Sequence, residues 1–174
     1  MATTESCFDF DAFFQAHYER IARAIARIVG DRARAEELAG EAFWKLWRNP
    51  QAHGPNAGGW VYRTAVRLGL NDLRAHRRRS RYETVPAGIQ SSSPPETPEE
   101  SHAAREEREQ VRFVLASLDG RQAELLLLRS SGLSYDEVAS ALDLNPASVG
   151  TLISRAQQAF RKEYLKQYGE RNGR

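Results

Sequence analysis

The 174-residue sequence contains a single cysteine, Cys7, and no long apolar segment. One cysteine excludes an internal disulfide and favours a reducing compartment. No stretch approaches the roughly 20 apolar residues that span a bilayer. Residues 1–11 also lack the basic start and apolar segment of a secretory signal. We therefore expect a cytoplasmic protein without membrane insertion.

The sequence also lacks the paired Glu-x-x-His motifs that hold metal ions in helical bundles. His17, together with Glu36, Glu37 and Glu41, is the only set that suggests a carboxylate–histidine site, and it does not form that motif. The remaining histidines are expected to be solvated: His53, His76 and His102. We expect no metal, no cofactor and no catalytic residue, so an enzyme is the least favoured class of function.

The net charge is only +2, but the charges are unevenly distributed along the chain. Residues 60–82 contain seven arginines and one acidic residue, Asp72. Residues 96–109 contain six glutamates and two arginines. This segregation predicts one face that binds a polyanion and another segment that is kept away from it.

The periodicity of apolar residues predicts an all-α fold. Apolar side chains recur at spacings of three and four, which is typical of helices, and no strand pattern appears. Gly30 and Asp31 are expected to end one helix and to cap the next. Asp119 and Gln122 form a capping-box pattern. The predicted helices cover residues 8–28, 32–48, 60–79, 104–118, 119–132, 134–142 and 146–165.

Residues 82–103 interrupt this pattern with a stretch rich in serine, proline and glutamate. Such a composition predicts a flexible, acidic linker. We therefore expect two small helical domains, 8–81 and 104–168, joined by that linker. Its extended reach of about 3.3–3.6 Å per residue would let the domains engage sites many tens of ångströms apart.

A helix-turn-helix is predicted at residues 134–165. Ser134 and Glu137 form a capping box, and after a short turn Asn145 precedes Pro146 at the start of a longer helix. A helix that enters a major groove about 12 Å wide needs short polar and basic residues on its outer face. A helical hairpin with a solvated polar face is the alternative. The outward residues are Ser148, Thr151, Ser154 and Arg155, with Arg161 further along the helix and nearer the DNA backbone.

Residues 60–79 place aromatic and arginine side chains on one predicted helix. Trp60 and Tyr62 would stack on unpaired bases while the arginines neutralise phosphates, as in proteins that hold single-stranded nucleic acid. The alternative is a core position for Trp60, which we favour for that residue, and a solvated helix end for the arginines.

Three segments resemble the extracytoplasmic-function class of bacterial RNA polymerase sigma factors, in the sigma-70 family. They are Ala35-Glu-Glu-Leu-Ala-Gly-Glu-Ala-Phe-Trp-Lys-Leu-Trp-Arg48, Gly59-Trp-Val-Tyr-Arg-Thr-Ala65 and Leu133-Ser-Tyr-Asp-Glu-Val-Ala139. The resemblance extends from about Phe10 to Leu165. It implies that the first domain is sigma region 2, which binds core polymerase and the −10 element, and that the second is region 4, which binds the −35 element.

The resemblance assigns roles to residues of this sequence. It implies an alternative sigma factor whose partners are core RNA polymerase (the β′ clamp and β flap), promoter DNA and an anti-sigma factor. The loop at residues 51–59 would hold a flipped −10 base. The implied −10 contacts are Asn56, Trp60, Tyr62, Arg63, Arg67, Asn71, Arg74, Arg77 and Arg78. The implied −35 contacts are the four outward residues of the helix-turn-helix and Arg161. The implied polymerase contacts are Glu36, Glu37, Glu41, Trp44 and Lys45, whereas Phe43 and Trp47 are expected in the core.

The sequence departs from the family pattern at four positions. Arg67 stands where the family commonly has Asn, and Asn71 stands where it has Asp. Gly150 and Leu152 replace two basic residues of the recognition helix. The −35 contact is therefore expected to be weaker or to rely on DNA shape. A stand-alone helix-turn-helix regulator, which would bind duplex DNA without polymerase, remains the rival hypothesis.

Overall fold

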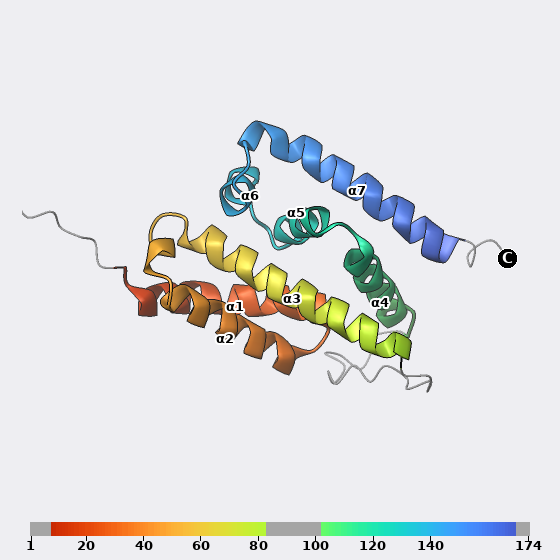
Figure 1. The fold of residues 1–174 in the computed structure, drawn as a ribbon, viewed down its shortest axis with the longest axis horizontal. Coiled ribbons are helices and arrows are strands. Elements are labelled where there is room, and N and C mark those ends of the chain that lie inside the picture. The colour runs from red at the N-terminus through yellow and green to blue at the C-terminus, as the bar shows by residue number, and fades with distance from the viewer. Residues whose placement is uncertain (1–7, 83–101, 170–174) are drawn as a thin grey trace, which may run out of the picture.

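The computed structural model describes residues 8–82 and 102–169, and every regular element in those ranges is a helix. This confirms the predicted all-α class. Figure 1 shows the helices in chain order. They are α1 (Phe10–Val29), α2 (Arg32–Trp47), the short 3-10 helix η1 (Pro50–Ala52), α3 (Ala57–Tyr82), α4 (His102–Ser117), α5 (Gly120–Ser130), α6 (Tyr135–Leu142) and α7 (Pro146–Tyr168).

Helices α1, α2 and α3 pack against one another and form the N-terminal domain. Their junction follows the sequence signals: Gly30 adopts a left-handed conformation with φ of 77° at the end of α1, and the Asp31 side chain accepts from the backbone N–H of Arg34. Phe43 is buried among aromatic rings of α1, including Phe14 at a centroid distance of 4.8 Å. The predicted core position of Phe43 is confirmed.

Two expectations about this domain were wrong. Trp47 is 60% exposed, because it is the last residue of α2 and lies to one side of the buried stripe that runs through Ala39, Ala42 and Leu46. Helix α3 begins at Ala57 rather than Trp60, so part of the predicted loop is helical. Ala57 is buried, and its packing fixes this early start despite the two glycines that follow it.

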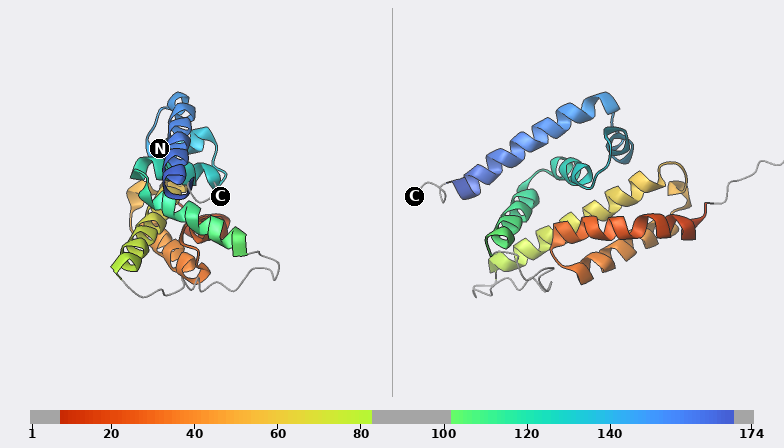
Figure 2. Two further views of the ribbon diagram at one scale, coloured as in Figure 1. Left: turned by 90° about the vertical axis from the view of Figure 1, so that its right-hand side faces the viewer. Right: turned by 180° about the vertical axis from the view of Figure 1, so that it is seen from behind.

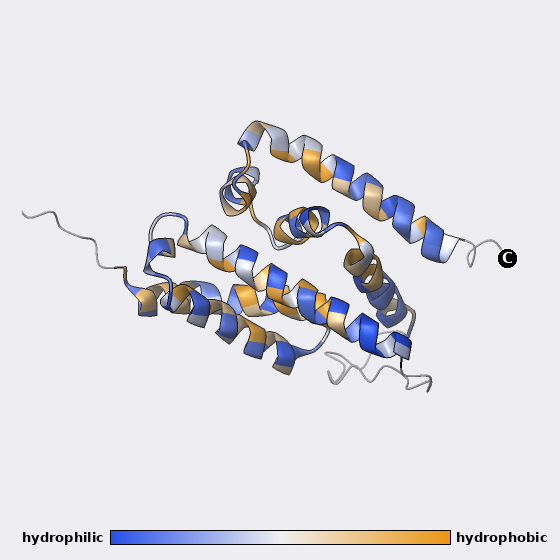
Figure 3. Cartoon of the chain, viewed as in Figure 1, coloured by the Kyte–Doolittle hydropathy of each residue, from blue (hydrophilic) through white to orange (hydrophobic). Residues whose placement is uncertain are grey.

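Helices α4 to α7 form the C-terminal domain, whose core contains Val114, Leu125, Leu128, Leu142 and Val149. Figure 3 shows apolar colouring concentrated on the inner faces of these helices, whereas the C-terminal half of α3 is mostly hydrophilic. The Asp119 side chain accepts from the N–H of Arg121, so α5 has a simple N-cap instead of the predicted reciprocal box with Gln122.

The two domains are packed together, with α3 between them. Helix α3 contacts α1 and α2 on one side and α4, α5 and α6 on the other. The views in Figures 1 and 2 show α7 on the outer side of the C-terminal domain, away from α1 to α3. The predicted linker lies almost entirely outside the described residues. Within the described ranges, no helix is both long and apolar enough to cross a membrane.

Candidate nucleic-acid interface

The helix-turn-helix has the local structure that its sequence predicts. The Ser134 side chain accepts from the N–H of Glu137, and the Glu137 carboxylate accepts from the N–H of Ser134 at 2.6 Å. That backbone hydrogen bond lowers the pKa of Glu137. In the turn, Asp143 adopts a left-handed conformation with φ of 53°. Asn145 then caps α7 by accepting from Ala147, and Pro146 occupies the first turn. Both predicted caps are confirmed.

The outer face of α7 is open to solvent. The helix packs on α4, α5 and α6 through an inner face that includes Val149, Ile153 and Ala156. All five residues predicted to contact the −35 element are exposed: Ser148, Thr151, Ser154, Arg155 and Arg161. The structure therefore leaves this candidate surface accessible without any movement of the domains.

The corresponding face of α3 is covered by the C-terminal domain. The Arg67 Nε donates to Oε1 of Glu124, on α5, at 2.6 Å. The Glu124 side chain is only 8% exposed, whereas that of Arg67 is 48% exposed. One turn earlier, Arg63 lies 3.7 Å from a carboxylate oxygen of Asp143. Two of the predicted phosphate contacts are thus paired with acidic side chains of the other domain.

Further along α3, two more arginines bind the C-terminal end of α4. Arg74 donates to the carbonyl oxygens of Ala116 at 3.3 Å and Leu118 at 3.0 Å. Arg77 donates to the carbonyl of Phe113 at 2.8 Å and also contacts the Ser117 hydroxyl. The carbonyls at a helix C-terminus carry partial negative charge, so they attract these guanidinium groups as phosphates would.

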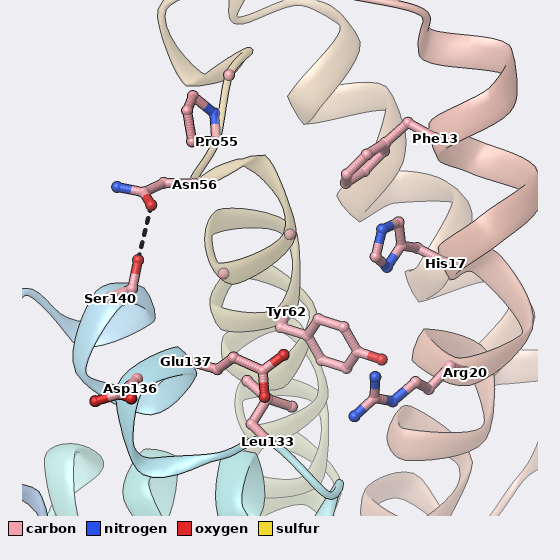
Figure 4. Close-up of a pocket in the computed structure, with 13 residues that line it drawn as sticks. Phe13, His17, Arg20, Pro55, Asn56, Tyr62, Leu133, Asp136, Glu137 and Ser140 are labelled. Atoms are coloured by element: carbon pink, nitrogen blue, oxygen red, sulfur yellow. Dashed lines mark hydrogen bonds between the residues drawn. The ribbon is translucent and has the colours of Figure 1, made fainter.

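The start of α3 meets α6 around a pocket of about 590 Å³. Figure 4 shows a hydrogen bond between two residues that line it, in which the Ser140 hydroxyl donates to Oδ1 of Asn56 at 2.9 Å. Tyr62 lines this pocket, and burial raises the pKa of its phenol. His17, on the α1 side, has a pKa lowered by burial and by Arg20. The pocket is lined by residues of both domains, and it lies at the loop predicted to hold a flipped base.

The two aromatic residues predicted to stack on bases are placed differently from that expectation. Tyr62 is 4% exposed and cannot stack on a base in this arrangement, since α1 and α6 enclose it. Trp60 is half-buried and packs against the hydrophobic core, as the alternative for that residue had it. Asn71 and Arg78 are exposed. Their contacts with DNA stay predictions.

The exposed side of α2 carries the predicted polymerase-binding residues. Trp44 is 52% exposed and lies beside Trp47, which the sequence reasoning had assigned to the core. Exposed ion pairs join Glu41 to Lys45 at 3.3 Å and Glu36 to Arg32 at 3.0 Å. Glu37 pairs with Arg34 at 2.7 Å. Because Trp44 and Trp47 are three residues apart, they form one apolar patch among charged groups.

Comparison with known proteins identifies both domains. The family model for sigma-70 region 2 matches residues 13–79, and the model for sigma-70 region 4 matches residues 108–159. A 30% identical relative, the RNA polymerase sigma-H factor of Pseudomonas aeruginosa, is matched over 88% of this chain and 84% of its own length. The chain belongs to the extracytoplasmic-function class of sigma-70 factors.

Other sigma factors align over most of this chain. The ECF RNA polymerase sigma factor SigE of Mycolicibacterium smegmatis is 29% identical over 91% of the chain and 62% of its own length. The probable RNA polymerase sigma factor RfaY of Xanthomonas campestris is 33% identical over 85% and 38%, respectively. The chain therefore spans less than two thirds of these two relatives. Sigma factors, as a family, are transcription factors rather than enzymes.

Two solved structures share the fold. The sigma factor RpoE of Bartonella quintana, solved in complex with the anti-sigma factor NepR, superposes with a TM-score of 0.54 at 18% identity, covering 89% of this chain and 96% of that one. CnrH, solved in complex with the cytosolic domain of CnrY, has a TM-score of 0.55 at 20% identity, covering 88% and 85%. The N-terminal domain is thus region 2 and the C-terminal domain is region 4.

Proposed function

We propose that this chain is an alternative sigma factor that binds core RNA polymerase, recognises −35 and −10 promoter elements and promotes transcription initiation. The observation that carries this proposal is the pairing of two DNA-binding features on one chain. An exposed recognition face on α7 would read the −35 element. The arginine-lined face of α3, with the loop that holds Asn56, would bind the melted −10 element. Phosphate neutralisation by the arginines would supply most of the affinity.

We infer that the exposed patch on α2 binds the polymerase. Aromatic residues in a charged surround are typical of the residues that dominate binding energy in protein interfaces. Trp44 and Trp47 supply such a patch, and the Glu36, Glu37 and Glu41 carboxylates would complement a basic partner surface. The resemblance implies that this patch binds the β′ clamp of the polymerase and that region 4 binds the β flap.

An anti-sigma factor is a further proposed partner, because the structural neighbour RpoE was solved in complex with the anti-sigma factor NepR. The proposed activity places the chain in the cytoplasm, where promoter DNA and polymerase are found. It also requires no catalytic residue, metal or cofactor in the chain itself. The catalytic chemistry of transcription would belong to the polymerase.

A stand-alone regulator is the second candidate, and one observation favours it. In this structure the α7 face is exposed while the α3 face is covered, as expected for a protein that reads duplex DNA by itself. The two candidates differ in their need for polymerase. A sigma factor directs initiation only with core enzyme, whereas a regulator binds its duplex site equally well without it.

The decisive experiment is in vitro transcription from genomic DNA fragments with core polymerase, followed by mapping of the transcript start sites. We expect defined start sites only when the chain is added, and co-elution of the chain with core enzyme. Trp44→Ala and Trp47→Ala should each abolish most co-elution while leaving helicity unchanged, since both side chains are exposed. Initiation no more specific than with core polymerase alone would refute the proposal.

A further inference from the structure

The pair formed by Arg67 and Glu124 joins the two domains at a position where this sequence departs from its family. Arg67 stands where the resemblance to the family implies Asn, and its Nε reaches Glu124 on α5 at 2.6 Å. Glu124 is the one charged residue that is fully buried in the described part of the chain, at 6% exposure. The departure therefore coincides with the shortest ion pair between the domains in the described part of the chain.

The buried carboxylate makes this contact sensitive to the domain arrangement. Oε1 of Glu124 is paired with Arg67, whereas Oε2 has only the guanidinium of Arg121 at 3.9 Å and no hydrogen bond. A buried charge is costly unless it is paired. With Arg67 present the closed arrangement is compatible with an ionised Glu124. Without Arg67 the carboxylate keeps only the more distant Arg121, so its exposure to water on opening becomes more favourable. The pair thus sets the balance between closed and open domains.

Other contacts between the domains include arginines bound to helix C-termini, in both directions. Arg74 and Arg77 of α3 bind the end of α4, as described above. From α1, Arg20 donates to the carbonyl of Ser131 at 3.3 Å and Arg27 to that of Ser130 at 3.4 Å, at the end of α5. In return, Arg112 of α4 donates to the carbonyl of Arg27 at 3.2 Å. These contacts are polar and exchangeable with water or phosphate.

Helix α6 is seated on the start of α3 through a close backbone approach. A Cβ placed on Gly59 would lie 3.1 Å from Cα and 3.2 Å from N of Ala141. Such contacts are tighter than most side chains make, so a larger residue here would have to displace Ala141 by a few tenths of an ångström. The hydrogen bond from Ser140 to Asn56 lies beside it. Together, these contacts occupy one face of α3 from Gly59 to Arg77, while the outer face of α7 stays free.

We propose that the packed arrangement is a self-inhibited state of this sigma factor, with the Arg67–Glu124 pair as its latch. In this state Arg67, Arg74 and Arg77 are bound to Glu124 and to a helix C-terminus, and Asn56 of the flipped-base loop is hydrogen-bonded to Ser140 of α6. Release of the latch separates the domains and exposes the −10 surface. The −35 surface is exposed in both states. The inhibitory role rests on the proposed function, whereas the latch itself is a statement about domain packing.

A disulfide trap measures the closed population without DNA. The Cβ built on Gly59 lies 3.3 Å from Cβ of Ala141, a few tenths of an ångström short of the usual ~3.5–4.5 Å separation in disulfides. The full chain would carry Gly59→Cys and Ala141→Cys, with Cys7→Ser to remove the native thiol. Its equilibrium with a glutathione redox buffer then reports how often the two domains meet.

Glu124→Gln is the test variant, because it removes the buried charge without altering the α3 face. We expect it to reduce the disulfide equilibrium constant about three- to tenfold. Arg67→Gln should have a similar effect from the other domain, and the double variant should add little, as a mutant cycle of one pair requires. Glu41→Gln on the exposed side of α2 is the matched control and should change nothing. Equal equilibrium constants for Glu124→Gln, Arg67→Gln and the parent would overturn the latch.

DNA binding by the same chain tests the inhibitory role. Non-template −10 single strands from a mapped promoter should bind at least about tenfold more weakly to the oxidised chain than to the reduced chain, while −35 duplex binding should be equal. Glu124→Gln, whose own side chain is outside the predicted DNA surface, should bind the single strand more tightly than the parent. If oxidation leaves −10 binding unchanged, the inhibition is refuted. If neither redox state binds the −10 strand, the proposed function is refuted instead. The disulfide equilibrium still tests the latch in that case, because it does not depend on DNA.

Discussion

The sequences of α3 and α7 both predict a surface that binds DNA, but the two surfaces differ in accessibility in the folded protein. Helix α7 presents Ser148, Thr151 and Arg155 to solvent. Helix α3 has Arg67, Arg74 and Arg77 turned to the other domain, where each has a hydrogen-bond partner. One recognition surface is ready in the described structure, and the other is covered.

The difference follows from what each helix can bind within the chain. The α3 arginines meet a buried carboxylate and helix ends, whose partial negative charge satisfies them. The outer face of α7 has no such partner in the described residues, and it is poor in basic groups at Gly150 and Leu152. The more basic surface is thus the one that the other domain can cover, because backbone carbonyls accept hydrogen bonds from its arginines.

The largest expected effect concerns the open helix. Arg155→Ala should weaken binding to a −35 duplex between about fivefold and 150-fold, because one good side-chain contact to a base contributes about 1–3 kcal/mol. The disulfide equilibrium between the domains should not change, since Arg155 is exposed on the far side of α7. Fluorescence anisotropy with duplex and single-stranded probes measures both elements. An equal loss for −10 DNA would contradict the division between the helices.

The next effect would make α7 more basic. Gly150→Arg should strengthen −35 duplex binding up to about tenfold and steepen its salt dependence, because it adds one phosphate contact. The site admits a side chain, since a Cβ there would lie 3.4 Å from the Tyr135 ring. Gly150→Ala is the control, and it should raise the free energy of unfolding by about 0.5–1 kcal/mol without tighter binding. If Gly150→Ala binds as tightly as Gly150→Arg, the gain comes from helix stability and not from charge.

A smaller effect separates covered from exposed arginines on α3. Arg78→Ala should weaken binding to −10 single strands about three- to tenfold, through the loss of one phosphate contact. Arg77→Ala should weaken it less, because the same substitution also removes the closing contacts to Phe113 and Ser117. Affinities measured over a range of salt concentrations test this order. A larger loss for Arg77→Ala than for Arg78→Ala would mean that covering α3 has no energetic consequence.

The smallest effect lies in the helix-turn-helix cap. The N–H of Ser134 holds the pKa of Glu137 below its ordinary value of 4.5. The ionised cap therefore contributes stability above that value, and the contribution is lost as the pH falls through the lowered pKa. Glu137→Gln should lower the thermal midpoint at pH 7 and differ less from the parent at low pH. Thermal unfolding followed by circular dichroism measures this. If the thermal midpoints of the parent and Glu137→Gln differ by the same amount at every pH, the cap stabilises the helix through its hydrogen bond and not through its charge.

Most of the fold was predictable because its signals are local. The spacing of apolar residues fixed the helices, and capping residues such as Gly30, Asp31 and Asn145 fixed their ends. The exposed residues of α7 were also placed correctly. The errors arose where packing decides the outcome. The early start of α3 at Ala57 depends on burial, and the exposure of Trp47 depends on which side of α2 meets the core.

The sequence by itself determined the all-α class, the helix-turn-helix and the family, since periodicity, caps and motif order are properties of short segments. Only the tertiary structure decided that α3 is covered and α7 is open. That outcome depends on Arg67 reaching Glu124 across 57 positions of sequence, and on a glycine that lets α6 approach α3. No local pattern encodes such a pairing, because the arginine-rich face of α3 has the same sequence whether it contacts DNA or another domain.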